Sequence, residues 1–155
     1  MRIEGYKESD EKDLLYVWEE SAKIAHGFIN EELQKTDILR VWNEFSKKLK
    51  TYVAKEGDIL CGFLSMYGNN IAGIFVAPEW QRKQIGKSLI DHAKKDRVPL
   101  SVEVFCKNTN AIRFYEKMGF RKFSEYMHPD FNEILWVMKM EENPNEPIIE
   151  EMLAP

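Results

Sequence analysis

Cysteine, histidine and long apolar runs are all scarce in this chain of 155 residues. The two cysteines, Cys61 and Cys106, lie far apart in apolar stretches, so we expect buried reduced thiols and no disulfide framework. The three histidines stand at unrelated spacings, which predicts no metal site. No run of ~18 apolar residues is present and the first residues lack the layout of a secretion signal. We therefore expect a cytoplasmic protein that makes no use of a membrane.

An excess of positive charge is also missing. Lysine and arginine total 22 against 26 aspartates and glutamates, a net charge of −4 that argues against a nucleic acid partner bound through a basic surface. The length and the 44% hydrophobic content suit one compact domain, which we place at residues 1–140. Residues 141–155 form an acidic, proline-containing tail that we expect to be mobile or a contact arm. A monomer and a homodimer both remain open.

A change of hydrophobic period divides the chain. After a short strand at residues 1–7, apolar residues recur at helical spacing in two segments, which predicts a helix ending near Gly27 and a second helix over residues 31–49. From Thr51 onward the pattern is typical of strands instead. The apolar stripes of the two helices are Leu14, Trp18, Ala22 and Ala25, followed by Ile38, Trp42, Phe45 and Leu49.

The second part of the chain begins with an antiparallel meander and then alternates helices with strands. Turns that contain Gly57 and Gly68 join the strands of the meander. The predicted order is βααβββαβαββ, an α/β fold in which a twisted central sheet is flanked by helices. The elements expected after residue 50 are strands at 51–55, 59–67 and 71–76, a helix to about residue 96, a strand at 98–105, a helix from Asn108 to Gly119, and strands at 120–127 and 134–140.

A basic loop joins the strand over residues 71–76 to the following helix. A helix start presents free N–H groups and the positive end of the helix dipole, and Gly86 lets an anion approach the backbone closely. Lysine and arginine side chains add positive charge to an otherwise acidic chain. The loop therefore predicts a pyrophosphate seat, with a solvated basic turn as the alternative. Its residues are Gln81, Arg82, Lys83, Gln84, Ile85, Gly86 and Lys87.

The same segment partly matches a nucleotide-binding motif. Gly86, Lys87 and Ser88 correspond to the end of the P-loop pattern G-x-x-x-x-G-K-[ST], which requires a first glycine at position 81. This chain has Gln81 there, and no later strand ends in an acidic residue placed to hold magnesium. A nucleotide hydrolase is therefore disfavoured.

Two motifs together resemble those of the GNAT acetyltransferases. The loop resembles the family signature [QR]-x-x-G-x-[GA], with Gln81 first, Gly86 last and Gln84 in place of the first glycine. A later segment resembles N-x-x-A-x-x-[LF]-Y-x-x-x-G-F at every anchor position, namely Asn108, Ala111, Phe114, Tyr115, Gly119 and Phe120. The resemblance implies a GNAT-type mixed sheet, acetyl-coenzyme A as co-substrate and no metal. It also implies that the backbone of Ile74, Phe75 and Val76 pairs with the pantetheine arm, and that Asn108 contacts the cofactor as well as capping a helix.

The resemblance also suggests catalytic roles for two side chains. An amine that attacks a thioester must lose a proton, and the departing thiolate must gain one. The tyrosine matching Tyr115 lies beside the thioester sulfur in the family, so Tyr115 is the candidate acid; packing on an amphipathic helix is the alternative. Glu103 lies on an apolar strand that we expect to be buried on both faces, where burial would raise its pKa and favour a role as base. A structural carboxylate is the alternative reading of Glu103.

The acceptor itself cannot be named from the sequence. In the family the acceptor pocket forms between the first two helices and the last two strands, which makes His26, Trp18 and Phe28 candidate substrate contacts. Cys106 has no histidine placed to activate it, so we expect direct transfer to a primary amine in a ternary complex. A non-catalytic acyl-coenzyme A sensor is the alternative that Gln84 keeps open. Further aromatic candidates, most of them expected in the core, are Trp42, Tyr126, His128 and Phe131.

Overall fold

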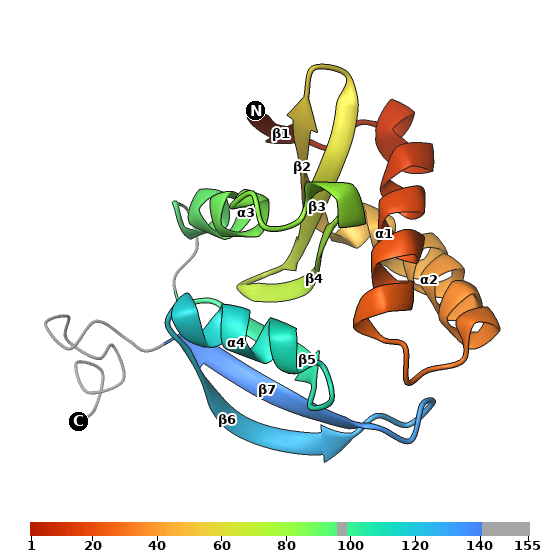
Figure 1. Ribbon diagram of the computed structural model, residues 1–155, viewed down its shortest axis with the longest axis vertical. Coiled ribbons are helices and arrows are strands. Elements are labelled where there is room, and N and C mark those ends of the chain that lie inside the picture. Colours follow the sequence, from red (N-terminus) through yellow and green to blue (C-terminus); the bar gives the residue numbers. More distant parts are fainter. Residues whose placement is uncertain (96–98, 141–155) are drawn as a thin grey trace, which may run out of the picture.

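The order of elements is the one that the hydrophobic periods predict. The computed structural model describes residues 1–95 and 99–140. The elements are β1 (Arg2–Gly5), α1 (Glu11–Ala25), α2 (Glu31–Phe45), β2 (Lys50–Glu56), β3 (Ile59–Tyr67), β4 (Asn70–Val76), α3 (Ile85–Lys94), β5 (Ser101–Phe105), α4 (Thr109–Lys117), β6 (Phe120–Met127) and β7 (Ile134–Met140). The seven strands pair into one sheet, and Figure 1 shows α1 and α2 together on one side of the molecule and α3 and α4 on the other.

The sheet is nearly divided between β4 and β5. The strand order is β1-β2-β3-β4-β5-β7-β6, and every neighbouring pair is antiparallel except β4 and β5, which are parallel. These two strands pair only at Asn70 with Ser101 and at Ile71 with Val102. Beyond Ile71 they diverge, as Figure 1 shows. Within the described part of the chain, the edge of β4 that faces β5 is therefore without a strand partner over residues 72–76.

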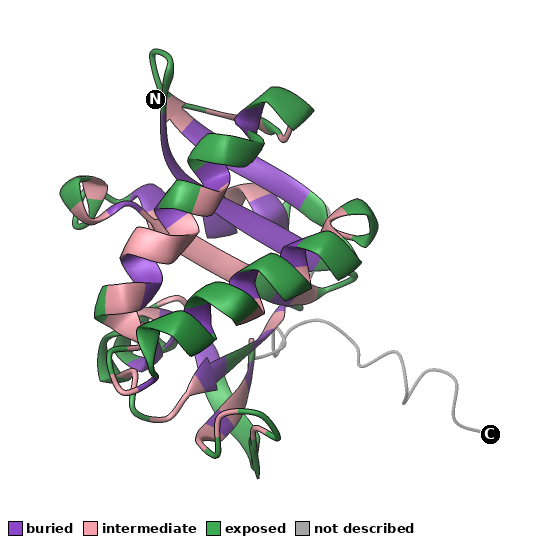
Figure 2. Cartoon of the chain, turned by 90° about the vertical axis from the view of Figure 1, so that its right-hand side faces the viewer, coloured by how far each residue is buried: buried purple, intermediate pink, exposed green. Residues whose placement is uncertain are grey.

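Each face of the sheet carries its own apolar cluster. Leu89 of α3 and Ile112 of α4 belong to one cluster, and Leu14 of α1 and Trp42 of α2 belong to the other. Adjacent residues of a strand point to opposite faces, so Phe63 joins the α1–α2 cluster while its neighbour Leu64 joins the α3–α4 cluster. Figure 2 shows that α1 and α2 expose their outer faces and cover buried strand segments.

The helices differ in detail from the predicted stripes. On α1, Val17 and Ser21 are buried, whereas Trp18 is only half-buried, because the helix faces the sheet at a slightly different angle. The second helix ends at Phe45 and continues as a short 3-10 turn over residues 46–48, instead of running to residue 49. Phe45 is 38% exposed, so its predicted place in the core is wrong.

Two other expectations are corrected near β5. Cys61 is buried, but Cys106 is half-buried and follows the end of β5 in a turn. The strand predicted from residue 98 begins at Ser101. Residues 96–98 and the acidic tail at 141–155 lie outside the described residues. In the part of the chain that is described, no helix has both the length and the apolar character needed to cross a membrane.

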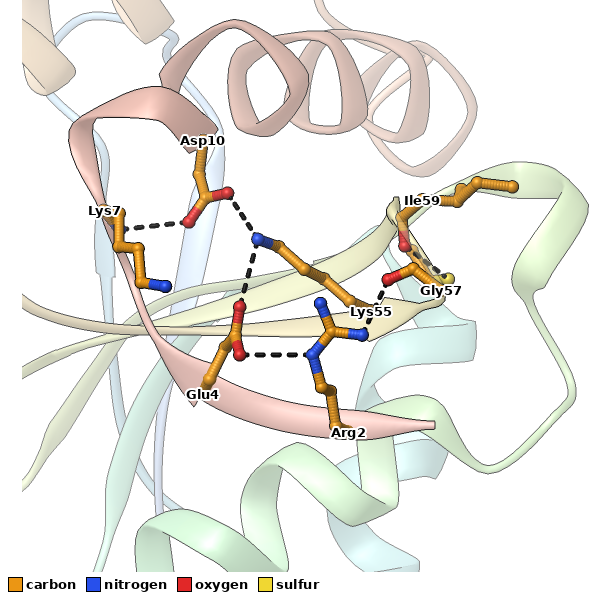
Figure 3. A network of polar contacts seen from close by, with 8 residues as sticks. Arg2, Glu4, Lys7, Asp10, Lys55, Gly57 and Ile59 are labelled. Carbon is orange, nitrogen blue, oxygen red and sulfur yellow. Dashed lines mark hydrogen bonds and ion pairs between the residues drawn. The ribbon is translucent and has the colours of Figure 1, made fainter.

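A polar network fixes the start of α1 against the edge of the sheet (Figure 3). Lys55 Nζ lies 2.7 Å from Asp10 Oδ1 and 3.1 Å from Glu4 Oε1, which joins β2 to β1 and to the turn before α1. Asp10 also accepts a hydrogen bond of 3.0 Å from the backbone N–H of Lys7. These hydrogen bonds raise the pKa of the Lys55 ammonium group, which therefore stays charged.

Candidate active site

The two predicted catalytic side chains lie on opposite faces of the sheet. Val102 and Val104 of β5 pack in the same cluster as Tyr115, on the side of α3 and α4. Glu103 stands between these valines and therefore points to the other face, toward α1 and α2. The diverging edges of β4 and β5 separate the two side chains, so a group that reached both would have to lie in that gap.

The predicted cofactor loop enters α3 through two left-handed residues. Gln81 Nε2 donates a hydrogen bond of 3.1 Å to the backbone oxygen of Val76, which holds the loop against the end of β4. Arg82 and Gln84 have φ angles of 61° and 66°. Gln84 thus adopts the conformation that glycine favours and acts as the residue before the first helical turn.

The start of α3 offers unpaired backbone donors. The first helical bond runs from the N–H of Ser88 to the oxygen of Gln84, at 3.0 Å. Within the described residues, the N–H groups of Ile85, Gly86 and Lys87 have no acceptor, and no side chain caps them. Because these donors lie at the positive end of the helix dipole, the geometry suits an anion.

The basic side chains of the loop differ in whether they already interact with another group of the protein. Lys87 forms an ion pair of 2.7 Å with Asp91 one turn later. Lys83 lies 4.8 Å from the centre of the Trp80 ring. Arg82 is exposed and has no ion pair with any described residue, so it is the cation of the loop best placed to meet an external anion.

Gly86 has a packing role that the sequence did not reveal. A Cβ atom at this position would lie 3.1 Å from Cζ of Phe114, closer than ordinary van der Waals contact. Glycine therefore allows the first turn of α3 to pack against α4. Its predicted role of admitting an anion to the backbone stays a prediction.

Tyr115 is packed in the core and still keeps a usable hydroxyl. The residue is 6% exposed, and its ring packs against that of Phe120 at 5.4 Å. Its hydroxyl has no hydrogen-bond partner among the described residues. It is not among the fully buried unpartnered side-chain atoms of these residues, of which Gln34 Oε1 is the only one. No other group of the described residues therefore holds the Tyr115 hydroxyl. Burial raises its pKa, so the phenol keeps its proton at neutral pH.

Asn108 caps α4 as the sequence predicts. Its Oδ1 accepts a hydrogen bond of 3.2 Å from the N–H of Ala111. The cap fixes the start of the helix that carries Tyr115, and the half-buried Asn108 lies directly after the turn that follows β5. Any contact between Asn108 and a cofactor stays a prediction.

Glu103 is exposed, so the expectation that β5 is buried on both faces is wrong. Only Val102 and Val104 of this strand are buried, because the strand has a helix-covered face and an open face. On the open face, the hydroxyl of Tyr126 donates a hydrogen bond of 2.6 Å to Glu103 Oε2. Burial, this hydrogen bond and the charge of Glu103 raise the pKa of Tyr126 to about 12. The Glu103 carboxylate is therefore exposed and held by a hydrogen bond.

A cavity of about 220 Å³ lies beside Glu103, between α1 and α2, the diverging strands, and the loop from β6 to β7. Of the predicted acceptor contacts, Trp18 and His26 line it, while Phe28 packs against the rings of His26 and Phe105 and does not line it. Trp42 is buried in the core. The ring-bearing side chains of the wall are Trp18, His26, Phe75, Phe105, His128 and Phe131.

His26 is the most strongly perturbed titratable group of this wall. Its ring lies 5.0 Å from that of Phe105 and 6.3 Å from that of Phe75. Burial among these rings lowers the pKa of His26 to about 4, so the imidazole is neutral at pH 7. It can therefore accept a hydrogen bond but brings no positive charge to the cavity.

Two polar residues of α2 also line the cavity and were missed by the sequence analysis. Gln34 lies three residues before Asp37 and four before Ile38, so it shares a helix face with each of them. The spacing of Gln34 from Ile38 in the predicted apolar stripe could have indicated that Gln34 faces the sheet. It was overlooked because polar residues beside a stripe usually face solvent.

Comparisons with known proteins agree with this geometry. The family model for the GNAT acetyltransferase domain matches residues 47–122. The chain is 35% identical over 108 residues to the peptidyl-lysine N-acetyltransferase YiaC of Escherichia coli, covering 69% of this chain and 74% of YiaC. The fold resembles that of apo YjaB from Escherichia coli (TM-score 0.78, 23% identity, 89% of this chain and 95% of YjaB). It also resembles the PaiA N-acetyltransferase of Thermoplasma acidophilum in complex with coenzyme A (TM-score 0.73, 24% identity, 92% of this chain and 100% of that one). The chain therefore belongs to the GNAT family and is an N-acetyltransferase.

Proposed function

We propose that this enzyme transfers the acetyl group of acetyl-coenzyme A to a primary amine by direct attack in a ternary complex. The observation that carries the proposal is the gap between β4 and β5, which has the hydroxyl-bearing Tyr115 on one face of the sheet and Glu103 on the other. A cofactor arriving from the α3–α4 side and an amine arriving from the cavity would meet there.

The residues around the gap fit coenzyme A on three counts. The unpaired N–H groups of Ile85, Gly86 and Lys87, with Arg82 nearby, suit a pyrophosphate. Among the described residues no strand pairs with the β5-facing edge of β4 at Ile74, Phe75 and Val76, so this edge offers backbone groups to the amides of a pantetheine arm, although the Val76 oxygen already accepts from Gln81 Nε2. The PaiA relative is known in complex with coenzyme A, which supports the same ligand here.

Glu103 is the proposed proton acceptor for the amine. A primary alkylamine, with a pKa of ~10, arrives protonated at pH 7 and must lose a proton before its lone pair can attack. Glu103 reaches the cavity as an exposed carboxylate, with Oε2 held by the hydroxyl of Tyr126 at 2.6 Å. The other oxygen, Oε1, has no partner in the described part of the chain and is left to receive the proton.

Tyr115 is the proposed proton donor on the other face. As the N–C bond forms and the C–S bond breaks, the departing thiolate needs a proton, and a phenol that stays protonated at neutral pH can supply it. The Tyr115 hydroxyl has no partner within the described residues that would hold its proton elsewhere. Packing of the ring and proton donation by the hydroxyl are compatible, because they use different ends of the side chain.

The test combines binding with transfer. A ligand at ~100 times its Kd adds ~2.7 kcal/mol to the stability of the fold, a shift of several degrees in Tm. We expect acetyl-coenzyme A to produce this shift, and a lysine peptide to release the thiol, since the relative YiaC is a peptidyl-lysine N-acetyltransferase. The absence of any shift with acetyl-coenzyme A would contradict the proposed cofactor seat.

Two conservative variants separate the roles. Tyr115→Phe keeps the ring packing and should lower kcat by about 100-fold or more, the usual scale of general acid catalysis. Glu103→Gln should lower kcat on a similar scale, while both variants keep the thermal shift with acetyl-coenzyme A. Unchanged kcat in both would refute the assigned roles and leave the family membership intact.

A further inference from the structure

Helix α2 presents hydrogen-bond acceptors to the cavity. Gln34 is 7% exposed, and its Nε2 donates to the backbone oxygens of His26 at 2.7 Å and Ile29 at 2.8 Å, which fixes which end of the amide is oxygen. Its Oε1 is buried with no partner, a situation found at no other side-chain nitrogen or oxygen in residues 1–95 and 99–140. Because this oxygen is itself buried, it belongs to the wall behind the cavity surface, and the recognition of a charge falls to the neighbouring acidic residue.

Asp37 adds a carboxylate on the same helix face. Its Oδ1 lies 2.8 Å from Nη2 of Arg40, and the second oxygen has no partner among the described residues. Arg40 does not line the cavity and is shared with Glu44, at 3.4 Å. Arg40 is thus shared between two carboxylates and leaves one oxygen of Asp37 unpaired within the described residues.

The rest of the lining supplies no opposing cation. Glu103 stands on the β5 side, and no lysine or arginine of the described residues lines the cavity. His26 is neutral at pH 7 because burial lowers its pKa to about 4. The remaining polar residues of the lining are Gln34, Asn70 and His128, whose Nδ1 accepts a hydrogen bond of 3.1 Å from the N–H of Asp130. The carboxylates of Asp37 and Glu103 are therefore the acidic groups of the lining. Such a lining attracts a cation that carries N–H donors.

We infer that the cavity selects an unbranched alkylammonium arm and that Asp37 recognises its positive charge. This inference rests on the proposed acetyl transfer and names the class of its acceptor. The volume of about 220 Å³ lies below the ~300–1,000 Å³ of pockets for drug-sized ligands, which favours a slender arm over a multi-ring amine. Rings such as those of Phe75 and Phe105 suit the methylene groups of the arm, and they attract its cationic end.

The test uses two acceptors of equal size that differ in charge. Pentylamine is a cation at pH 7, and O-butylhydroxylamine has the same number of heavy atoms but is neutral. For the variant Asp37→Asn we expect KM for pentylamine to rise by about five- to tenfold with little change in kcat, because charge recognition acts on binding. KM for O-butylhydroxylamine should stay within about twofold, and Asp37→Glu should restore most of the loss.

Glu44→Gln is the matched control, because it removes the other carboxylate paired with Arg40 on the same helix, outside the cavity. We expect it to leave both KM values unchanged. Equal effects of Asp37→Asn on the two acceptors, or the same selective effect in Glu44→Gln, would overturn the inference. So would turnover of the aminoglycoside kanamycin as efficient as that of pentylamine.

A binding measurement distinguishes this inference from the proposed reaction. Calorimetric titration of pentylamine into the protein with coenzyme A should show affinity that Asp37→Asn weakens. If no amine is acetylated but this charge-dependent binding is seen, the proposed reaction fails and the inference stands. If amines are acetylated but Asp37→Asn binds pentylamine like the wild type, the inference alone fails.

Discussion

The hydroxyl of Tyr126 on β6 donates a hydrogen bond of 2.6 Å to the carboxylate of Glu103 on β5, across the intervening strand β7. The contact holds one carboxylate oxygen, and the other has no partner among the described residues. Tyr126 is therefore a positioning residue for the proposed base, in a place where the sequence suggested only a general aromatic candidate.

Removal of this hydroxyl should lower turnover only while Glu103 is present. We expect Tyr126→Phe to reduce kcat by about three- to tenfold, the effect of losing a solvent-exposed hydrogen bond of ~1 kcal/mol. In the Glu103→Gln background the same change should have almost no further effect. Steady-state kinetics of the four proteins gives the coupling. If the two effects simply multiply, Tyr126 does not act through Glu103.

The left-handed conformation of Gln84 predicts a stabilising substitution. A residue with a Cβ atom loses about 1–2 kcal/mol of stability at a φ of 66°. Glycine avoids this strain, but part of the gain is offset because glycine gives the unfolded chain more conformational entropy. We expect Gln84→Gly to be more stable than Gln84→Ala by about 0.5–1 kcal/mol in urea unfolding. Affinity for acetyl-coenzyme A should stay within about twofold, because the loop already has the glycine-like geometry. An equal stability of the two variants would show that residue 84 carries no strain.

The contact between α3 and α4 predicts that a smaller side chain at position 114 restores stability lost by a substitution at Gly86. A Cβ atom there would lie 3.1 Å from the ring of Phe114, so Gly86→Ala should destabilise the fold by about 1–3 kcal/mol. Phe114→Leu should relieve the clash, so the double variant should lose less stability than the sum of the single changes. Affinity for acetyl-coenzyme A in the double variant then isolates any role of Gly86 toward the anion. Strict additivity of the two changes would argue against the packing role.

The buried imidazole of His26 predicts a loss of stability in acid. Its pKa falls from 6.5 to about 4 on folding, so between these values the unfolded chain binds more protons than the folded one. Stability from this group is present above pH 6.5 and is lost as pH falls toward 4, by about 3 kcal/mol at most. His26→Phe and His26→Gln should both flatten the decline in unfolding free energy across this window. A decline as steep as in the wild type would place the titration elsewhere.

Local features of the chain were readable before the structure. Asn108 caps α4 through a bond to a residue three positions away, and Gly119 ends the helix region with a φ of 98°. The element order and the turns at Gly57 and Gly68 were likewise predicted from the sequence. Each depends on hydrogen bonds and backbone preferences within a few residues, so periodicity and turn chemistry suffice to predict it.

The face toward which Glu103 points was decided by the tertiary structure. An apolar strand such as β5 predicts burial but cannot show whether both faces are covered. On one face the helices bury Val102 and Val104 and no other residue of β5. On the other face Tyr126, which lies 23 residues later in the chain than Glu103, donates a hydrogen bond to Glu103. The short pairing of β4 with β5 is likewise invisible in either strand alone.

The amino-acid sequence by itself determined the family motifs, the helices and strands, and the residue types available for acid and base chemistry. The packing of α1 and α2 against the divided sheet decided which of those residues meet. Trp18, Asp37, Glu103 and His128 line one cavity although they come from four separate segments. Contacts of this kind depend on the position of whole elements relative to one another, which long-range packing fixes and local periodicity does not encode.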